Sequence, residues 1–452
     1  MVLPFHARFA SHPAAGLVLH PSRTWVACSD EHQCKERGGV IPDRLERRLG
    51  TRDAVVIGLA SMLGAGIFAA VGPAAEAAGA ALLYGLLLAG AVAFCNAMSS
   101  ASLAAVYPAS GGTYVYGRER LGRFWGYLAG WAFVVGKLAS LAAMALTFGT
   151  YAAPEFARPL AVTAVVVLTA VNYRGVTKTA RLARVIVTLV LCALATIVIA
   201  SLLGGQADLD NLGGDLTDPS VSGVLRSAGL LFFAFAGYAR IATMGEEVRD
   251  PKRTIPRAIP MALGLTMVIY VLVDGAALLA IGPDRVADST APLTDAVAAG
   301  DLSWLAPAAR IGAAIASLGV LLSLITGVSR TLFAMAGNRE LPVALAAVHP
   351  RFKVPYRAEL VVGAIVATLA VTTDLRSVIG FSSFAVLFYY AIANASAWTL
   401  AREQLLWPRL FSGAGFVGCL ALALSLPVAA AGVGAGVLAL GALIYLVWLK
   451  DE

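Results

Sequence analysis

Five side chains that could carry a charge or bind an ion lie inside long apolar runs of this 452-residue sequence: Lys137, Arg240, Asp274, Ser323 and Thr326. Charged groups are costly in hydrocarbon and usually face the interior of a helix bundle, where they are paired or functional. A lysine held away from water gives up its proton more readily, because desolvation disfavours the charged form. Lys137 is therefore a candidate for proton exchange. The alternative is a static ion pair of Lys137 or Arg240 with Asp274.

The two hydroxyl residues suggest a different chemistry. Ser323 and Thr326 are three residues apart, so they share one face of a helix. Together with backbone carbonyl groups from an interrupted helix, they could coordinate a sodium ion. The alternative is that each hydroxyl donates to a carbonyl group in its own helix.

Two apolar runs contain small residues where a helix would be weakened. Residues 55–72 read VVIGLASMLGAGIFAAVG, with Gly-Ala-Gly at 64–66, and residues 230–248 read LLFFAFAGYARIATMGEEV, with Gly237 near the middle. Glycine is a poor helix former, so we expect the helix to be interrupted at both places. The alternative is that these glycines serve close packing of neighbouring membrane helices.

An interrupted helix leaves backbone N–H and C=O groups without partners. Each such group costs several kcal/mol in hydrocarbon unless a ligand or water pairs with it. Free amides near Ile67, at the positive end of a helix, suit a carboxylate. Carbonyl groups that end a helix near Ala236 and Gly237 suit an ammonium group. The pair of interruptions therefore predicts a binding site for a zwitterion.

Composition indicates the kind of elements that position these residues. Hydrophobic residues make up 59% of the chain and charged residues 13%, whereas about a quarter of the residues in soluble domains are charged. Only helices and closed barrels satisfy every backbone group in lipid, and a spanning helix needs about 20 apolar residues. We expect an all-α polytopic membrane protein with about twelve spans: 54–78, 81–105, 124–150, 159–173, 183–203, 223–245, 257–281, 307–335, 358–374, 376–400, 406–428 and 430–449.

The two interruptions lie in the first and sixth predicted spans, so their helices cross the membrane in opposite directions. Interrupted spans at corresponding positions of two inverted halves are the best sequence indication of a transporter site. We therefore expect residues 43–400 to form an inverted-repeat transporter core of two five-helix units. Residues 401–452 would add two helices and a short cytoplasmic C-terminus, and residues 1–42 a disordered cytoplasmic tail.

Most of the 34 Lys and Arg residues lie in alternate connections, starting with the segment before the first span. Only five lie in the opposite connections, which are rich in aspartate: Arg158, Arg226, Arg285, Arg310 and Arg376. Because cytoplasmic loops are enriched in Lys and Arg, both termini are expected in the cytoplasm. The formal charge of +7 follows this topology, and no basic stripe with interleaved aromatic residues indicates nucleic-acid binding.

The five cysteines indicate neither a disulfide framework nor a metal site. Their number is odd, and three of them lie inside predicted spans. Cys28, His32 and Cys34 offer three possible ligands, whereas closed structural zinc sites use four. We expect neither a metal nor another cofactor.

Four further segments have sequences specific enough to suggest a family: GAGIF at 64–68, GRFWGYLAGW at 122–131, FAFAGYARIATMGEEVRDPKRTIPRAI at 233–259 and SRTLFAMAGNRELP at 329–342. They resemble the amino acid–polyamine–organocation superfamily of permeases, and the third segment particularly resembles bacterial relatives of cationic amino acid transporters. The resemblance covers about residues 42–400. It implies a LeuT-type fold and secondary transport of amino acids across a bacterial plasma membrane by alternating access, coupled to protons or by exchange.

The resemblance also implies roles for the residues at the two interruptions. The substrate carboxylate would be held by Gly64, Ala65, Gly66 and Ile67. The amine and side chain would be surrounded by Phe235, Ala236 and Gly237.

Gates are implied on both sides of this site. Phe233 falls where family members often place an aromatic gate, although a ring that only packs is the alternative. Glu246, Glu247 and Arg249 resemble the salt bridges of an inner gate, and a solvated surface charge cluster is the alternative.

The sequence departs from the family pattern after Gly237. Several exchangers and cationic transporters have an acidic side chain there, whereas this chain continues with Tyr238, Ala239 and Arg240. An arginine so close to the site would repel a cationic substrate by several kcal/mol at an effective dielectric constant of about 20. Neutral amino acids are therefore favoured as substrates.

Two other classes of function remain open. An integral-membrane transferase that acts on lipid diphosphates would need carboxylates for Mg²⁺. The candidate run, DLDNLGGDLTD at 208–218, is expected on the wrong, non-cytoplasmic side and has little basic support. A sensor that binds an amino acid without transporting it is the second. Transport itself involves no covalent chemistry, so we do not expect an enzyme.

Overall fold

The computed structural model of the chain describes residues 16–19, 25–28, 49–107, 111–175, 180–213, 216–242 and 248–449. The chain divides into two compact units, Met1–Arg47 and Arg48–Glu452. In the first unit, β1 (Gly16–Leu19) pairs antiparallel with β2 (Trp25–Cys28). Branched and aromatic residues in these two segments favour strands, and the disorder expected for residues 1–42 stays a prediction.

The second unit is built from helices. Its first half contains α2 (Thr51–Met62), α3 (Ala65–Ala69), α4 (Val71–Ala78), α5 (Leu82–Val106), α6 (Thr113–Leu121), α7 (Arg123–Ala152), α8 (Ala157–Tyr173) and α9 (Ala180–Leu203). Its second half contains α10 (Val221–Phe235), α11 (Ala239–Ala242), α12 (Pro251–Asp288), α13 (Pro292–Ala298), α14 (Ala306–Gly337), α15 (Tyr356–Thr372), α16 (Leu375–Trp398), α17 (Arg409–Ser425) and α18 (Val428–Ile444). Short 3₁₀ turns are η1 (Gly79–Ala81), η2 (Pro154–Phe156), η3 (Asp210–Leu212), η4 (Ala236–Tyr238), η5 (Ser303–Leu305), η6 (Val343–Ala346) and η7 (Arg402–Gln404), and η8 (Tyr445–Leu449) is a π-helix.

Every predicted span coincides with one or more of these helices. Within the described residues, ten helical segments are long and apolar enough to cross a membrane. α15 and α17 have 17 residues each, the lower end of the length that can span a bilayer. The structure therefore gives a helical second unit with the spans of a multi-pass membrane protein, and the count of about twelve spans stays a prediction.

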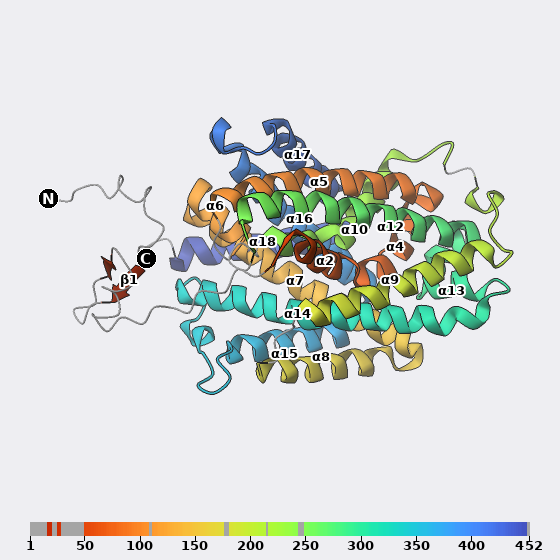
Figure 1. The fold of residues 1–452 in the computed structure, drawn as a ribbon, viewed down its shortest axis with the longest axis horizontal. Helices are drawn as coiled ribbons and strands as arrows, with labels where there is room; N and C mark the ends of the chain where they lie inside the picture. Colours follow the sequence, from red (N-terminus) through yellow and green to blue (C-terminus); the bar gives the residue numbers. More distant parts are fainter. Residues whose placement is uncertain are drawn as a thin grey trace. The chain divides into compact units, whose positions relative to one another are not determined.

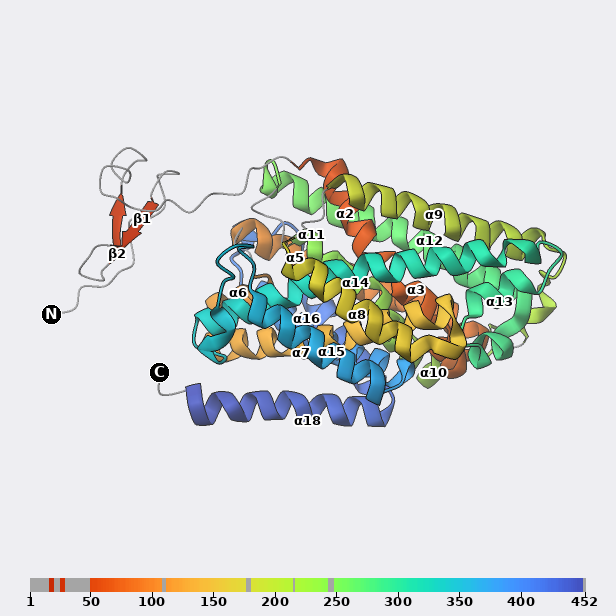
Figure 2. The ribbon, with the colours of Figure 1, turned by 90° about the horizontal axis from the view of Figure 1, so that it is seen from below.

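The long helices of the second unit run side by side (Figure 1). α7 packs against α14 and α16, while α10 packs against α5 and α16. α18 lies along the outside of the bundle (Figure 2). The interrupted helices α2–α3 and α10–η4 are therefore surrounded by longer, continuous helices.

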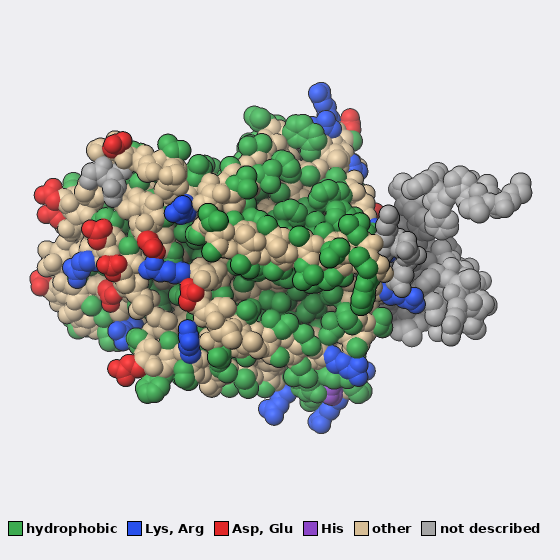
Figure 3. Space-filling model, turned by 180° about the vertical axis from the view of Figure 1, so that it is seen from behind, with side chains coloured by type: hydrophobic (Ala, Val, Ile, Leu, Met, Phe, Trp, Pro, Cys, Tyr) green, Lys and Arg blue, Asp and Glu red, His purple; other side chains and the backbone are tan. Residues whose placement is uncertain are grey.

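Hydrophobic and acidic side chains occupy different parts of the surface of the bundle. Hydrophobic side chains cover the middle of the face seen in Figure 3, and acidic side chains gather at one end. Exposed aspartates lie between α9 and α10 (Asp208 and Asp210), near the end of α12 (Asp284), in α13 (Asp295) and shortly after it (Asp301). Large apolar residues such as Leu189, Val268, Ile311 and Leu424 are exposed along the helices. An exposed apolar surface of this kind is typical of a protein in contact with lipid.

Candidate functional site

The first interruption lies between α2 and α3. Leu63 and Gly64 leave the helical conformation, with Gly64 at φ −117° and ψ −153°. The helix then restarts at Ala65 and continues through Ala70 into α4, since Ala70 N donates to Gly66 O at 2.9 Å and Ala74 N to Ala70 O at 3.1 Å. The first amides of this restarted helix have no carbonyl group one turn earlier to bind. The backbone amides at the start of α3 are therefore free donors, as expected.

The second interruption is milder than expected. α10 ends at Phe235, and Ala236–Tyr238 form the single 3₁₀ turn η4 before α11 begins. Ala236 N donates to Phe233 O, so the chain tightens here rather than unwinding. A 3₁₀ turn keeps part of the local hydrogen bonding, which leaves fewer free carbonyl groups than a full break.

Glycines bring the two interruptions into contact. A Cβ atom at Gly66 would lie 2.6 Å from the Cα of Ala234, and one at Gly237 would collide with the backbone of Ser61. A Cβ at Gly64 would lie 2.5 Å from Val320 of α14. The close-packing role considered for these glycines is therefore real, and it coexists with the interruption of both helices.

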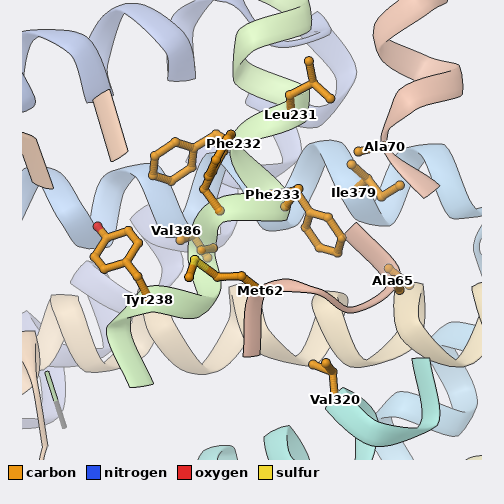
Figure 4. Packing of buried hydrophobic residues seen from close by; sticks show 14 of the residues in the cluster. Met62, Ala65, Ala70, Leu231, Phe232, Phe233, Tyr238, Val320, Ile379 and Val386 are labelled. Carbon is orange, nitrogen blue, oxygen red and sulfur yellow. The ribbon is translucent and has the colours of Figure 1, made fainter. Parts of the chain in front are cut away.

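Side chains close the space between the interrupted helices. The ring of Phe233 points toward Ala65 (Figure 4). Phe233 is 6% exposed and Ile67 1% exposed. The expected substrate residues are buried except Gly237, which is partly exposed. These residues are thus largely shielded from solvent in the structure, and we call this arrangement the closed form.

Tyr270 of α12 joins the two interruptions, and sequence reasoning missed it. Its hydroxyl lies 2.6 Å from Met62 O at the end of α2 and 3.1 Å from Ala234 O in α10. The side chain is fully buried and its ring contacts Phe235 with centroids 5.2 Å apart. One hydroxyl thus serves carbonyl groups of both interrupted helices.

Two other tyrosines also bind carbonyl groups at the interruptions. The Tyr151 hydroxyl donates to Phe68 O at 2.9 Å, and the Tyr390 hydroxyl to Ala236 O at 3.4 Å. The Tyr390 ring stacks on Tyr238 with centroids 5.0 Å apart. A tyrosine inside an apolar run carries no spacing signal, so only the fold reveals this set.

The ionisable residues inside the spans do not form the expected ion pair. Both carboxylate oxygens of Asp274 lack a hydrogen-bond partner, and the side chain is fully buried. Lys137 is 8% exposed and forms no ion pair with any described residue. Arg240 is partly exposed and has an interaction of its own, but not with Asp274. The static pair considered as the alternative is therefore wrong for this structure.

The two hydroxyl residues expected to bind sodium are not brought together. Ser323 is exposed, and the Thr326 hydroxyl lies 3.5 Å from Leu322 O in its own helix. Val320 is the α14 residue closest to the first interruption at Gly64. This placement gives no support to a sodium site built from both hydroxyls.

Of the three residues expected at the inner gate, Glu246 and Glu247 lie outside the described residues. Arg249 is exposed, and its amide donates to Leu49 O at 2.8 Å beside a parallel bridge between Leu49 and Val248. The segment after the second interruption is thus attached to the chain that enters α2.

A polar cluster at the basic end of the bundle was not predicted. The Tyr114 hydroxyl donates to Glu340 at 2.6 Å, Arg118 donates to Glu340 at 3.2 Å, and Asn338 donates to Tyr114 at 2.6 Å. Burial raises the pKa of Glu340 above its ordinary value, although Tyr114 and Arg118 act in the opposite direction. Burial and the nearby Glu340 raise the pKa of Tyr114 to about 12. The cluster ties α6 to the end of α14.

Two adjoining cavities lie at the acidic end of α12. They have volumes of about 210 and 390 Å³ and share Ile281 and Arg285 as lining residues. Asp295 lines the first and Asp208 the second. These cavities are separate from the residues expected to bind the substrate.

Known proteins are similar to this chain over most of its length. The family model described as "Amino acid permease" matches residues 49–449. An uncharacterized transporter of Mycobacterium tuberculosis is 61% identical over 90% of this chain and 92% of its own length. Cationic amino acid transporter 7, chloroplastic, of Arabidopsis thaliana is 28% identical over 83% of this chain and 69% of its own. The branched-chain amino acid permease BcaP of Bacillus subtilis is 25% identical over 82% and 84%.

Proposed function

The chain belongs to the amino acid permease family, and we propose that it carries α-amino acids across the membrane by alternating access. The observation that carries this proposal is the interruption of α2 at Leu63 and Gly64 in direct contact with α10 and η4. Unpaired backbone groups are tolerated at membrane depth only where they are buried in protein or line a cavity. A zwitterionic ligand satisfies both kinds of group.

In the proposed site, the amides of Ala65, Gly66 and Ile67 bind the substrate carboxylate, and Gly64 allows the ligand to approach the backbone. The positive end of the restarted helix adds a favourable field for the anion. Carbonyl groups around Phe235, Ala236 and Gly237 receive the ammonium group. Phe233, which points toward Ala65 (Figure 4), closes over the ligand.

The movement we propose is a rocking of helices around this site, in a LeuT-type core of two inverted five-helix units over residues 43–400. α17 and α18 lie outside that core. Glu246, Glu247 and Arg249 form an inner gate that opens toward the cytoplasm. The attachment of Arg249 to Leu49 supports this role, because movement of the second interruption is then transmitted to the start of α2.

Neutral amino acids are the proposed substrates. Arg240, three residues after Gly237, opposes a second positive charge on the ligand. Its own interaction weakens this effect without removing the charge. The similar proteins named above include both a cationic and a branched-chain transporter, so the ligand class has to be decided by experiment.

We propose that uptake is coupled to protons or proceeds by exchange. Lys137 and Asp274 are the candidates for this coupling: Asp274 is fully buried with no hydrogen-bond partner, and Lys137 forms no ion pair with any described residue. The exposure of Ser323 favours a proton over sodium. The proposed location is the plasma membrane of a bacterial cell, with both termini in the cytoplasm.

A transport assay tests this function. It uses purified protein in proteoliposomes, labelled amino acids, and imposed proton and sodium gradients. We expect saturable uptake and counterflow of a neutral amino acid that persist without sodium. Binding with no counterflow would identify a sensor instead. Turnover of a lipid diphosphate with Mg²⁺ would identify a transferase.

A further inference from the structure

We propose that Asp274 is the group that binds the coupled proton, and that the proton reaches it from the outer end of α12. This inference rests on the proposed function, because it assigns one step of proton-coupled transport to one side chain. It starts from the burial of Asp274, whose two carboxylate oxygens both lack a partner. An ionised carboxylate in such surroundings costs several kcal/mol. The closed form therefore suits the neutral carboxylic acid.

Among the described residues, no charged side chain pairs with Asp274. The titratable groups described on elements packed against α12 are Arg52, Asp53, Glu76, Tyr84, Cys95, Arg184, Cys192, Asp210, Tyr238, Arg240 and Asp295. None of them donates to or pairs with Asp274. Several have partners elsewhere: Asp53 pairs with Arg184 at 3.8 Å, Glu76 with Arg376, and Asp295 accepts from Ser289.

Asp274 is connected to the proposed substrate site through its own helix. Tyr270 lies one turn earlier on the same face of α12, and its hydroxyl contacts Met62 O and Ala234 O. Thr266, one further turn along, is fully buried and its hydroxyl also lacks a partner. A polar stripe on one helix face thus runs from Asp274 to the contact between the two interrupted helices.

The same face leads from Asp274 toward the acidic end. Ile281, two turns later on this face, lines both cavities at that end. Leu278 and Ile281 are buried and separate Asp274 from the cavities. Gly282, at φ +74° and ψ 162°, interrupts α12 next to Ile281. Movement at this kink would let water from the acidic outer cavities reach the carboxylate.

In the proposed cycle, an O–H bond forms between Asp274 and a proton delivered by water from the outer side. The neutral side chain then allows the closed form shown by the structure. When the inner side opens, water takes the proton away and the carboxylate is ionised again. Lys137 is the competing candidate, but it lies on α7 and no described contact links it to Tyr270.

The test measures accumulation of the transported amino acid in proteoliposomes with an imposed pH gradient of one unit and the membrane potential held at zero. If one proton accompanies each neutral substrate, wild type supports about tenfold accumulation, because a factor of ten corresponds to 1.4 kcal/mol. We expect Asp274→Asn to show no accumulation above the outside concentration while counterflow continues. Asp284→Asn removes the same charge from an exposed position of the same helix and should behave as wild type.

The proposal is overturned if Asp274→Asn accumulates substrate as wild type does, if only Lys137→Met abolishes accumulation, or if wild type shows counterflow without response to the gradient. Absence of counterflow in wild type would instead remove the proposed function, and the inference with it. If Asp274→Asn loses counterflow as well, infrared spectroscopy tests whether Asp274 is protonated in the wild type. The carbonyl band of protonated carboxylic acids at neutral pH should be weaker in Asp274→Asn than in wild type by the contribution of one group; an unchanged band overturns the proposal.

Discussion

Gly66 and Gly237 leave no room for a side chain where the two interrupted helices meet. At Gly66 the nearest atom to an added Cβ would be the Cα of Ala234 at 2.6 Å, and a backbone atom cannot move aside as a side-chain end can. The contact therefore fixes how closely α3 and α10 approach. Any larger residue has to separate them.

Gly66→Ala should accordingly destabilise the protein and reduce uptake, because overpacking typically costs about 1–3 kcal/mol. The melting temperature of the purified protein and the initial rate of uptake measure both effects. Gly264→Ala is the matched control, since Gly264 is exposed and an added Cβ meets nothing within 4 Å. An unaltered melting temperature and uptake rate in Gly66→Ala would argue against the close contact.

Tyr270→Phe should destabilise the protein by about 0.5–1.5 kcal/mol, because it removes the hydroxyl that binds carbonyl oxygens of both interrupted helices. We expect a lower melting temperature and a changed apparent KM for the substrate. Tyr84→Phe removes a hydroxyl that donates to Leu216 O at 3.1 Å on an exposed side chain and should change little. If Tyr270→Phe and Tyr84→Phe had the same melting temperature, the Tyr270 hydroxyl would not stabilise the contact between the two interrupted helices.

The sequence allows Gly64 and Gly237 to be identified because small residues inside an apolar run are unusual enough to require a reason. It does not allow Tyr270 or Glu340 to be identified. Their partners are backbone carbonyl groups and side chains at large sequence separation, and no spacing rule relates them. Asp274 could be found as a charge in a span, but the absence of a partner could not.

At the scale of elements, helix positions follow from hydrophobic runs more reliably than the details of their interruptions do. Every predicted span contains a helix, yet the second interruption is a 3₁₀ turn rather than an unwound segment. The sequence cannot distinguish a 3₁₀ turn from an unwound segment here, since both need a small residue at position 237. The sequence of α6 also gives no sign that Tyr114 and Arg118 bind Glu340 and so join α6 to the end of α14.

The contact of Glu340 with Tyr114 and Arg118 predicts that the stability of the protein depends on pH. Burial raises the pKa of Glu340 above its ordinary value of 4.5, so the folded protein holds this proton to higher pH than the unfolded chain does. The contribution to stability is fully present below the ordinary value and is lost as the pH rises through the raised one. Melting temperatures of wild type and Glu340→Gln between about pH 4 and pH 8 test this.

The difference in melting temperature, wild type minus Glu340→Gln, should fall as the pH rises. A difference that stays constant or grows would mean that Glu340 is not held in its buried contact with Tyr114. Arg120, whose Nε donates to Thr399 at 2.9 Å on an exposed surface, offers Arg120→Gln as a control that should leave the pH dependence unchanged.

At the scale of the whole molecule, charge distribution predicts orientation. Basic residues gather in the connections assigned to the cytoplasm and aspartates in the opposite ones, as the positive-inside rule requires. In cells, and in a background without native cysteines, Asp284→Cys should react with a membrane-impermeant thiol reagent added outside. Arg351→Cys, also exposed, should react only after the membrane is opened. The reverse pattern would invert the topology and the direction of proton entry.

The central claim is that an α-amino acid binds where the two interrupted helices meet. An experimentally determined structure with the transported amino acid bound tests it most directly. We predict the carboxylate of the ligand against the amides of Ala65, Gly66 and Ile67, with its ammonium group facing the carbonyl groups near Ala236. A ligand found elsewhere, for example in the cavities beside Arg285, with these backbone groups unchanged, would contradict the account.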